Sequence, residues 1–333
     1  MPAEPVGRSL AQQLSAYLTK RLGQPVEVTG LTRLPGGASR ETWALDAMLD
    51  GRSLPLILRR DPPGRPSTRD YAHEARLLRT AQLAAVPVPT VRWEESGSGV
   101  LEAPFILMDR VEGETIPRRI LRDAALAAAR QCLTAQCGAA LARIHAMPLD
   151  RLEFLGAPQS PQQLLDAQLS MLDTLGEPHP VFELALRWLR SNAVASRPAA
   201  LVHGDFRVGN VIVGPEGLRA VLDWELAHVG HPAEDLGWFC VRAWRFGNDA
   251  RAAGGLGSRD ELLQAYLAAG GAPLQYGELR FWEVYGTLRW GIMCLLQASF
   301  HLSGVTRSVE LAAIGRRACE MEWALLELME GRG

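Results

Sequence analysis

The segment from position 201 to position 225 constrains this chain of 333 residues more than any other. It reads LVHGDFRVGNVIVGPEGLRAVLDWE, with Asp205 and Asn210 before two apolar runs and Asp223 after them. The sequence Gly-Pro-Glu-Gly between the apolar runs is a turn signal, so residues 211–222 predict a β-hairpin. The hairpin would bring Asn210 and Asp223 close together, so the fold must place two carboxylates and one amide around a single hairpin.

This set of polar groups suits the transfer of a phosphoryl group assisted by Mg²⁺. Such a transfer asks the protein mainly for positioning and for charge neutralisation. Asp205 has the place of a carboxylate that orients an acceptor hydroxyl and takes its proton. The Asp223 carboxylate and the Asn210 amide are hard oxygen ligands, which Mg²⁺ prefers. We therefore predict Mg²⁺-dependent phosphoryl transfer, with Asp205 as the catalytic base.

Three other interpretations of these residues stay open. As ordinary turn residues, Asp205 could cap a helix and Asn210 could adopt a left-handed conformation. A catalytically silent nucleotide-binding or scaffold protein could keep the same fold, although the complete set of polar groups argues against silence. A metallohydrolase would hold a transition metal with His203, Asp205, Asp223, His228 and His231. For His203 we favour a buried imidazole that holds the loop by hydrogen bonds.

Length, charge and cysteine content narrow the class of protein. The chain is long enough for two lobes, and its formal charge of −2 with no basic tract leads us to expect neither a nucleic-acid nor a membrane partner. No apolar run approaches the roughly 20 residues of a membrane span, and the N-terminus shows no apolar signal segment. The five cysteines lack C-x-x-C spacing and are odd in number, so we expect reduced thiols in the core of a cytoplasmic protein.

The pattern of apolar residues and turn signals predicts an α+β fold with two lobes, 1–108 and 109–333. The small lobe should combine an antiparallel sheet, from strands at 26–34, 41–46, 53–60, 89–94 and 105–108, with helices at 9–22 and 68–84. The large lobe should be mostly helical, over 123–146, 161–175, 181–191, 234–244, 258–269, 276–301 and 309–330. The segment 201–230 interrupts these helices.

Four segments carry a resemblance to a known family, in the order LPGGASRETW, LILRRDPPG, LVHGDFRVGNVIV and VLDWELAHVGHPAEDLGW. In them the chain resembles the aminoglycoside phosphotransferase family, which shares the two-lobed fold of the protein kinases. The Asp-Trp-Glu and the double Arg look most like the phosphotransferase-like proteins and domains associated with acyl-CoA dehydrogenases. The resemblance implies a nucleotide-binding N-terminal lobe, a catalytic C-terminal lobe, and transfer of the γ-phosphate of ATP to a hydroxyl of a small molecule.

By this resemblance, the motifs assign roles in the large lobe. Asp205 matches the catalytic base, while Asn210 and Asp223 match the Mg²⁺ ligands. Asp235 matches an aspartate that braces the catalytic loop, which is a structural role. Arg207, inside the same loop, is a second candidate catalytic residue, because it could meet a substrate anion or a developing negative charge. It could equally pair with a nearby carboxylate such as Glu225.

In the small lobe, the resemblance points to one cation and its partner. The family usually has a lysine that holds the α- and β-phosphates; here Arg59 takes that place, with Arg60 beside it. Alternation along a strand lets only one of the two face the phosphates. We favour Arg59, because the apolar residues of the strand leave the facing side unclear while the resemblance to the family favours the first arginine. Arginine can bind phosphate through two hydrogen bonds, and Arg59 could pair with Glu74 on the following helix. Solvated arginines at a strand end remain the alternative.

Two further segments complete the nucleotide site that the resemblance implies. The loop Pro35-Gly36-Gly37-Ala38-Ser39 departs from the G-x-G-x-x-G pattern. It could still cover phosphates with backbone N–H groups and the Ser39 hydroxyl, although it would also pass for an ordinary turn. The stretch from Met108 to Val111, which includes Arg110, matches the hinge that hydrogen-bonds adenine through backbone groups.

The sequence does not identify the small molecule that would accept the phosphoryl group. Cationic aminoglycosides would need a cluster of carboxylates, and residues 234–301 show none, because arginines accompany Glu278 and Glu283. The same region is rich in aromatic and apolar residues around Trp282, which would either fill the core or line a pocket. In the second case the acceptor would be a hydrophobic or acyl-like hydroxyl compound.

Overall fold

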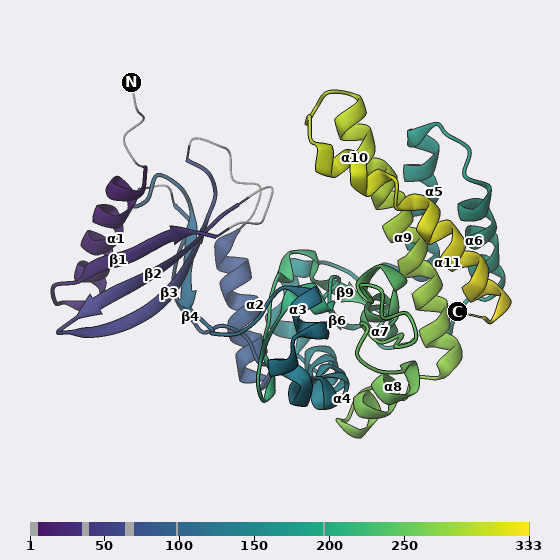
Figure 1. Ribbon diagram of the computed structural model, residues 1–333, viewed down its shortest axis with the longest axis horizontal. Coiled ribbons are helices and arrows are strands. Elements are labelled where there is room, and N and C mark those ends of the chain that lie inside the picture. The colour runs from purple at the N-terminus through teal and green to yellow at the C-terminus, as the bar shows by residue number, and fades with distance from the viewer. Residues whose placement is uncertain (1–5, 35–39, 64–69, 98, 196, 333) are drawn as a thin grey trace. The chain divides into compact units, whose positions relative to one another are not determined.

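The computed structural model describes residues 6–34, 40–63, 70–97, 99–195 and 197–332. The chain divides into two compact units, Met1–Glu112 and Gly113–Gly333, so the division falls a few residues beyond the boundary expected after residue 108. The first unit is built around an antiparallel sheet, and the second is mostly helical (Figure 1). The expected α+β class is confirmed.

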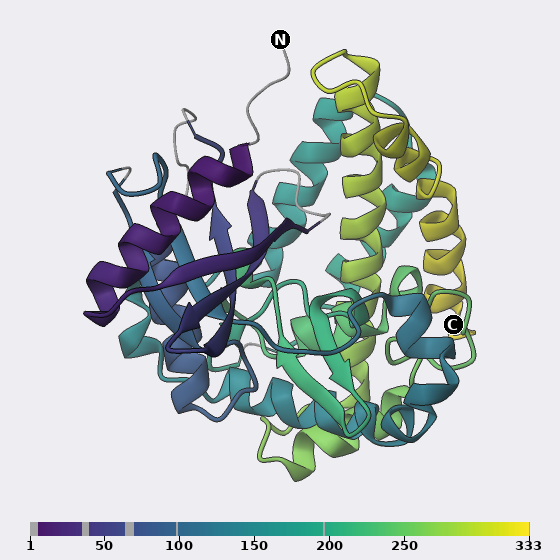
Figure 2. The same ribbon diagram turned by 60° about the vertical axis from the view of Figure 1, so that its left-hand side comes forward.

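A five-stranded antiparallel sheet in the order β1–β2–β3–β5–β4 forms the first unit. The elements are β1 Glu27–Arg33, β2 Glu41–Leu49, β3 Arg52–Arg60, β4 Val91–Glu95, β5 Phe105–Asp109, α1 Val6–Leu22 and α2 Tyr71–Leu83. Helix α1 lies along one face of the sheet (Figure 2), where Leu14 and Leu18 share a core with Leu45 and Leu56. The helix repeats its leucines every four residues and the strands every two, so both present an apolar face to this core.

The second unit is helical and carries two small antiparallel sheets, β6–β9 and β7–β8. Its helices are α3 Pro117–Arg122, α4 Ala127–His145, α5 Pro161–Leu175, α6 Pro180–Ser191, α7 Ala233–Cys240, α8 Arg259–Ala268, α9 Tyr276–Leu302, α10 Val309–Gly315 and α11 Ala318–Glu330. The long helix α9 is central, because α5, α6, α7, α10 and α11 all pack against it (Figure 1). Gly237 allows α7 to approach closely, since a Cβ there would lie 2.4 Å from the carbonyl carbon of Trp282.

Three of the expected helices are interrupted. The helix expected over 123–146 begins only at Ala127, because the Asp123 side chain caps a short 3₁₀ turn and the residues before it form α3. The helix expected over 234–244 ends at Cys240 and continues as a 3₁₀ turn. The helix expected over 309–330 is split into α10 and α11. At the end of α10, Gly315 packs so closely on α9 that a Cβ would lie 2.4 Å from the Cβ of Ala298.

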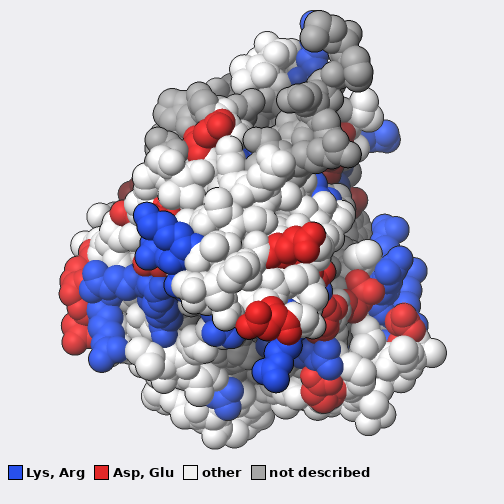
Figure 3. Space-filling view, turned by 90° about the vertical axis from the view of Figure 1, so that its left-hand side faces the viewer, with Lys and Arg blue, Asp and Glu red and all other residues white. Residues whose placement is uncertain are grey.

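The cysteines are placed partly in the core and partly toward the surface. All five cysteines are free, but Cys132 is half-buried and Cys319 is exposed, so the expected placement in the core is wrong for these two. Positive and negative side chains are interspersed on the face that Figure 3 shows. Across the described ranges, no helix combines the length and the apolar character that a membrane span needs.

A buried ion cluster ties α9 to two other segments of the second unit. The Glu283 carboxylate, with 1% of its side chain exposed, accepts hydrogen bonds from Arg259 Nε (2.6 Å) and Nη2 (2.7 Å) on α8. It accepts a third from Arg245 Nη2 (2.9 Å), and Arg245 also donates to the Cys240 carbonyl at the end of α7. Charges removed from water must be compensated, so both guanidinium groups depend on this one carboxylate.

Replacing Glu283 by alanine should therefore lower the free energy of unfolding by about 3–5 kcal/mol, because two buried cations lose their partner. Urea unfolding of the variant and the wild type measures this difference. Asp166→Ala is the matched control, since it removes the carboxylate of an exposed pair with Arg190 and should cost less than about 1 kcal/mol. Equal losses in the two variants would show that the cluster contributes no more than a surface pair.

Candidate active site

The segment 200–230 folds as two short strand pairs joined by turns. The pairs are β6 Ala200–Val202 with β9 His228–Gly230, and β7 Val211–Gly214 with β8 Gly217–Val221. The predicted hairpin is thus present, and a hydrogen bond from the Leu222 N–H to the Asn210 carbonyl (2.8 Å) extends it. Asn210 and Asp223 therefore flank the open end of the hairpin.

The carboxylate of Asp205 is held by three side-chain donors. Asn210 Nδ2 donates to Oδ2 at 2.6 Å, and Trp238 Nε1 donates to Oδ1 at 2.8 Å. Arg207 Nε lies 3.1 and 3.2 Å from the two oxygens. The carboxylate is thereby fixed in one orientation while 15% of the side chain stays exposed, as a base that must contact an acceptor requires.

The groups at the end of the hairpin fit a magnesium ion. Asn210 Nδ2 also donates to the Asp205 carbonyl (2.9 Å), so both amide hydrogens are engaged and Oδ1 is left to accept. Asp223 has a left-handed backbone (φ 62°, ψ 63°), a conformation that is rare outside glycine and is concentrated at functional sites. Mg²⁺ keeps several waters, so one carboxylate and one amide oxygen suffice as protein ligands.

The side chain of Arg207 contacts two other residues of the second unit. Besides its contact with Asp205, its guanidinium carbon lies 5.0 Å from the ring centroid of Trp244, in a cation–π arrangement. From the sequence, Arg207 could either bind an anion of the substrate or pair with a carboxylate of the chain. The structure shows that it contacts one such carboxylate, that of Asp205. Its role toward a developing charge stays a prediction.

The loop that carries Asp205 is braced by the buried carboxylate of Asp235 on α7. This carboxylate accepts hydrogen bonds from the backbone N–H groups of His203 (2.7 Å) and Gly204 (2.9 Å), and from His145 Nε2 (3.1 Å). Burial alone would raise the pKa of Asp235, but the hydrogen bonds from His145 and the loop hold it below its ordinary value. Only glycine fits at position 204, where φ is 80° and a Cβ would lie 2.3 Å from the Leu226 carbonyl oxygen.

His203 is fully buried and holds the loop by hydrogen bonds, as predicted. Its Nδ1 accepts from the Asp205 N–H (3.2 Å), so Nε2 carries the proton that it donates to the Leu222 carbonyl (3.0 Å). Burial lowers the pKa of His203, which keeps the imidazole neutral.

His228 pairs with Glu234, and within the described ranges no three His, Cys, Asp or Glu side chains gather as a metal cluster. The metallohydrolase interpretation gains no support from this arrangement.

In the first unit, the expected pair of Arg59 and Glu74 is present. Arg59 Nη1 donates to Glu74 Oε1 at 2.8 Å. Arg40, which the sequence did not single out, donates to the other carboxylate oxygen at 2.6 Å. Arg60 points to the opposite face of β3, where it is 3% exposed and bonds Glu41 (2.9 Å) and a backbone carbonyl. Strand alternation therefore separates the two neighbouring arginines.

The other expected nucleotide contacts remain predictions. Gly36, Gly37 and Ser39 lie outside the described residues. Met108 lies within β5, which pairs with β3 on one side and β4 on the other. The Arg110 N–H donates to the Pro55 carbonyl (3.1 Å) and its side chain bonds Asp46 (3.1 Å), so only its carbonyl group is left for an adenine.

Three aromatic residues in the first half of α9 lie in the core of the second unit. Phe281, Trp282 and Tyr285 are at most 3% exposed, so these rings do not line an open pocket. Trp238 is equally buried, yet its indole N–H reaches the catalytic loop. Sequence reasoning did not predict the contact of Trp238 with Asp205 or that of His145 with Asp235, because nothing near position 205 indicates which distant helices supply these hydrogen bonds.

Comparisons with known sequences identify relatives. Residues 30–282, well over half of the chain, match a family described as "Phosphotransferase enzyme family" (APH). Over 256 residues the chain is 30% identical to acyl-CoA dehydrogenase family member 10 of Mus musculus. That match covers 71% of this chain and 23% of the mouse protein, so the chain spans about a quarter of that relative's length.

Solved structures share the fold. A protein of Ralstonia eutropha assigned to the aminoglycoside phosphotransferases matches with a TM-score of 0.75 at 20% identity, covering 96% of this chain and 98% of the other. A thermostable mutant of an aminoglycoside phosphotransferase, in ternary complex with AMP-PNP and hygromycin B, matches with a TM-score of 0.63 at 19% identity, covering 95% and 98%. The family match confirms the resemblance read from the motifs, and the chain belongs to the APH phosphotransferase enzyme family.

Proposed function

We propose that the chain transfers the γ-phosphate of ATP to a hydroxyl group of a small molecule, with Asp205 as the catalytic base. The observation that carries this proposal is the Asp205 carboxylate, which three donors fix on a loop whose Asn210 neighbours Asp223. A turn residue or a helix cap needs no such arrangement. The related structure in complex with AMP-PNP and hygromycin B supports a nucleotide and a small molecule as the two reactants.

Residues of the second unit would act on the acceptor. Asp205 would orient the acceptor O–H and take its proton as the oxygen attacks the γ-phosphorus. Arg207, already in contact with Asp205, would place positive charge beside the reacting groups. Asn210 and Asp223 would hold Mg²⁺, whose charge neutralises phosphate oxygens.

The first unit would supply the cation for the nucleotide phosphates. Arg59 can bind two phosphate oxygens at once, and Glu74 orients its guanidinium. A hydrophobic or acyl-like acceptor gains no support from Phe281, Trp282 and Tyr285 of α9, because these rings are buried.

Asp205→Asn tests the base. Phosphoryl transfer should fall by about 10²–10⁴-fold, because the amide keeps the shape of the side chain but cannot take a proton. ADP release with a panel of hydroxyl compounds measures this, while AMP-PNP affinity and the unfolding temperature should stay near wild type. Wild-type turnover in the variant would refute the assignment. Nucleotide binding without ADP release by the wild-type protein would instead favour the catalytically silent alternative.

Asp223→Asn tests the metal ligands. This substitution removes the charge but keeps a residue that tolerates the left-handed backbone. Calorimetric titration with AMP-PNP should show that the gain in affinity given by Mg²⁺ falls at least about tenfold. Asn210→Ala should reduce that gain less, since an amide brings no charge. A gain of wild-type size in Asp223→Asn would contradict the site.

Arg59→Ala and Arg60→Ala form a matched pair of neighbouring substitutions. Arg59→Ala should raise the KM for ATP and lower turnover, and Arg59→Lys should keep part of the activity because a point charge still reaches phosphate. Arg60→Ala should instead destabilise the fold, since Glu41 loses a buried partner, and should leave the KM for ATP near wild type. The choice of Arg59 is wrong if the KM for ATP responds to Arg60→Ala alone.

A further inference from the structure

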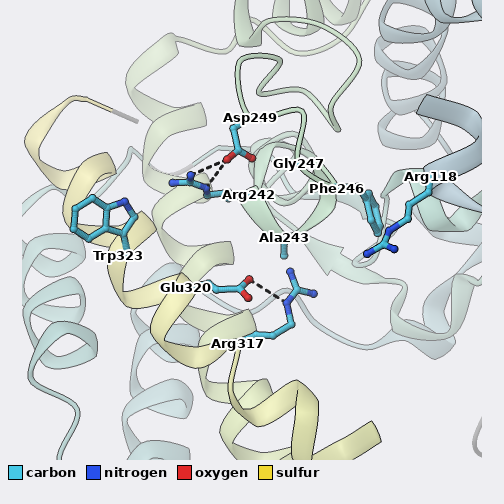
Figure 4. A pocket seen from close by; sticks show the side chains of 9 residues that line it. All are labelled: Arg118, Arg242, Ala243, Phe246, Gly247, Asp249, Arg317, Glu320 and Trp323. Carbon is cyan, nitrogen blue, oxygen red and sulfur yellow. Dashed lines mark hydrogen bonds and ion pairs between the residues drawn. The ribbon is translucent and has the colours of Figure 1, made fainter. Parts of the chain in front are cut away.

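A pocket within the second unit lies between α3, the segment 242–249 and α11 (Figure 4). Its volume is about 770 Å³, within the range of about 300–1,000 Å³ that small-molecule sites occupy. Arg118 of α3, Phe246 of the middle segment and Trp323 of α11 are part of its lining. Its size and its mixture of charged side chains with aromatic surface suit an organic molecule that carries a polar end.

Two walls of this pocket touch the catalytic loop. Pro117, at the start of α3, lies beside Gly209, because a Cβ on Gly209 would come 3.5 Å from the Pro117 ring. Trp244, in the wall segment 242–249, lies under the guanidinium of Arg207. The elements that form the pocket thus also contact the loop that carries Asp205, through residues other than those that line the pocket.

The arginines of the pocket differ in how far they are neutralised. Arg242 is paired with Asp249 (2.7 Å) and Glu327 (2.9 Å), and the pair of Arg317 and Glu320 (3.1 Å) neutralises a second cation. Arg118 is exposed, and among the residues that the structure describes it has no hydrogen-bond or ion-pair partner. Figure 4 shows its guanidinium pointing toward the pocket. Arg118 is thus the cation that a bound molecule would find available.

We propose that this pocket takes the acceptor and that Arg118 binds an oxyanion on it, a carboxylate or a phosphate; this rests on the proposed phosphotransferase function. A guanidinium matches both oxyanions through two parallel hydrogen bonds and repels a cationic acceptor. Phe246 and the 60%-exposed Trp323 offer apolar surface to the carbon skeleton of such a molecule. The acceptor class is therefore a hydroxylated acid or phosphate ester.

A charge-matched panel of acceptors tests the proposal by ADP release. Sets of hydroxyl compounds with the same skeleton should end in a carboxylate, a phosphate, an amide or an amine. Turnover should concentrate in the carboxylate or the phosphate members. Arg118→Ala should raise the KM for these acceptors about tenfold or more without changing the KM for ATP. Arg119→Ala is the matched control, because Arg119 pairs with Glu114 and does not line the pocket.

A binding measurement separates the pocket from the reaction. The anionic aromatic dye 8-anilinonaphthalene-1-sulfonate should bind about tenfold more weakly to Arg118→Glu than to wild type, and Arg119→Glu should not change its affinity. Equal dye affinity in Arg118→Glu and wild type overturns the oxyanion site. Turnover confined to amide or amine acceptors, or a KM for ATP raised by Arg118→Ala, overturns the acceptor assignment and leaves the phosphotransferase standing. Dye binding that depends on Arg118, without ADP release from any compound, keeps the oxyanion site and rejects the function.

Discussion

The loop that carries Asp205 depends on the buried carboxylate of Asp235. Removing a charged group from water costs roughly several kcal/mol for each ion, unless other groups compensate the charge. Here the compensation comes from the backbone of the loop itself, through His203 and Gly204, and from His145 on α4. The loop cannot shift without uncovering the charge, so the position of Asp205 follows from this anchor.

Helix α7 combines three tasks within one turn. Asp235 anchors the loop, Gly237 lets the helix backbone approach α9, and Trp238 donates to Asp205. Residues three apart lie on the same side of a helix, which is why the anchor and the donor both reach the catalytic loop. The packing of α7 against α9 thereby sets the direction of the Asp205 carboxylate.

Local patterns in the sequence were sufficient for the hairpin and for its polar ends at Asn210 and Asp223, whereas the pair of Arg59 and Glu74 was predicted from the resemblance to a known family. In each case the partners are close along the chain or lie on consecutive elements whose geometry is regular. The donor Trp238 could not be foreseen, because its contact joins residues whose proximity only the packed helices determine. The interruption of the last helix at Gly315 has the same cause, since it depends on Ala298 across a helix interface. Periodicity also does not separate a ring in the core from a ring in a pocket, as for Trp282.

Glu74 accepts from two arginines at once, with 12% of its side chain exposed. An enclosed carboxylate that relied on a single cation would be left uncompensated whenever that cation turned to another anion. Arg40 would remove this difficulty, because it would still neutralise Glu74 if Arg59 changed its partner. A phosphate that approached Arg59 would then replace Glu74 as the hydrogen-bond partner of that arginine. Glu74 would stay paired with Arg40, so no buried charge would lose its partner during that exchange.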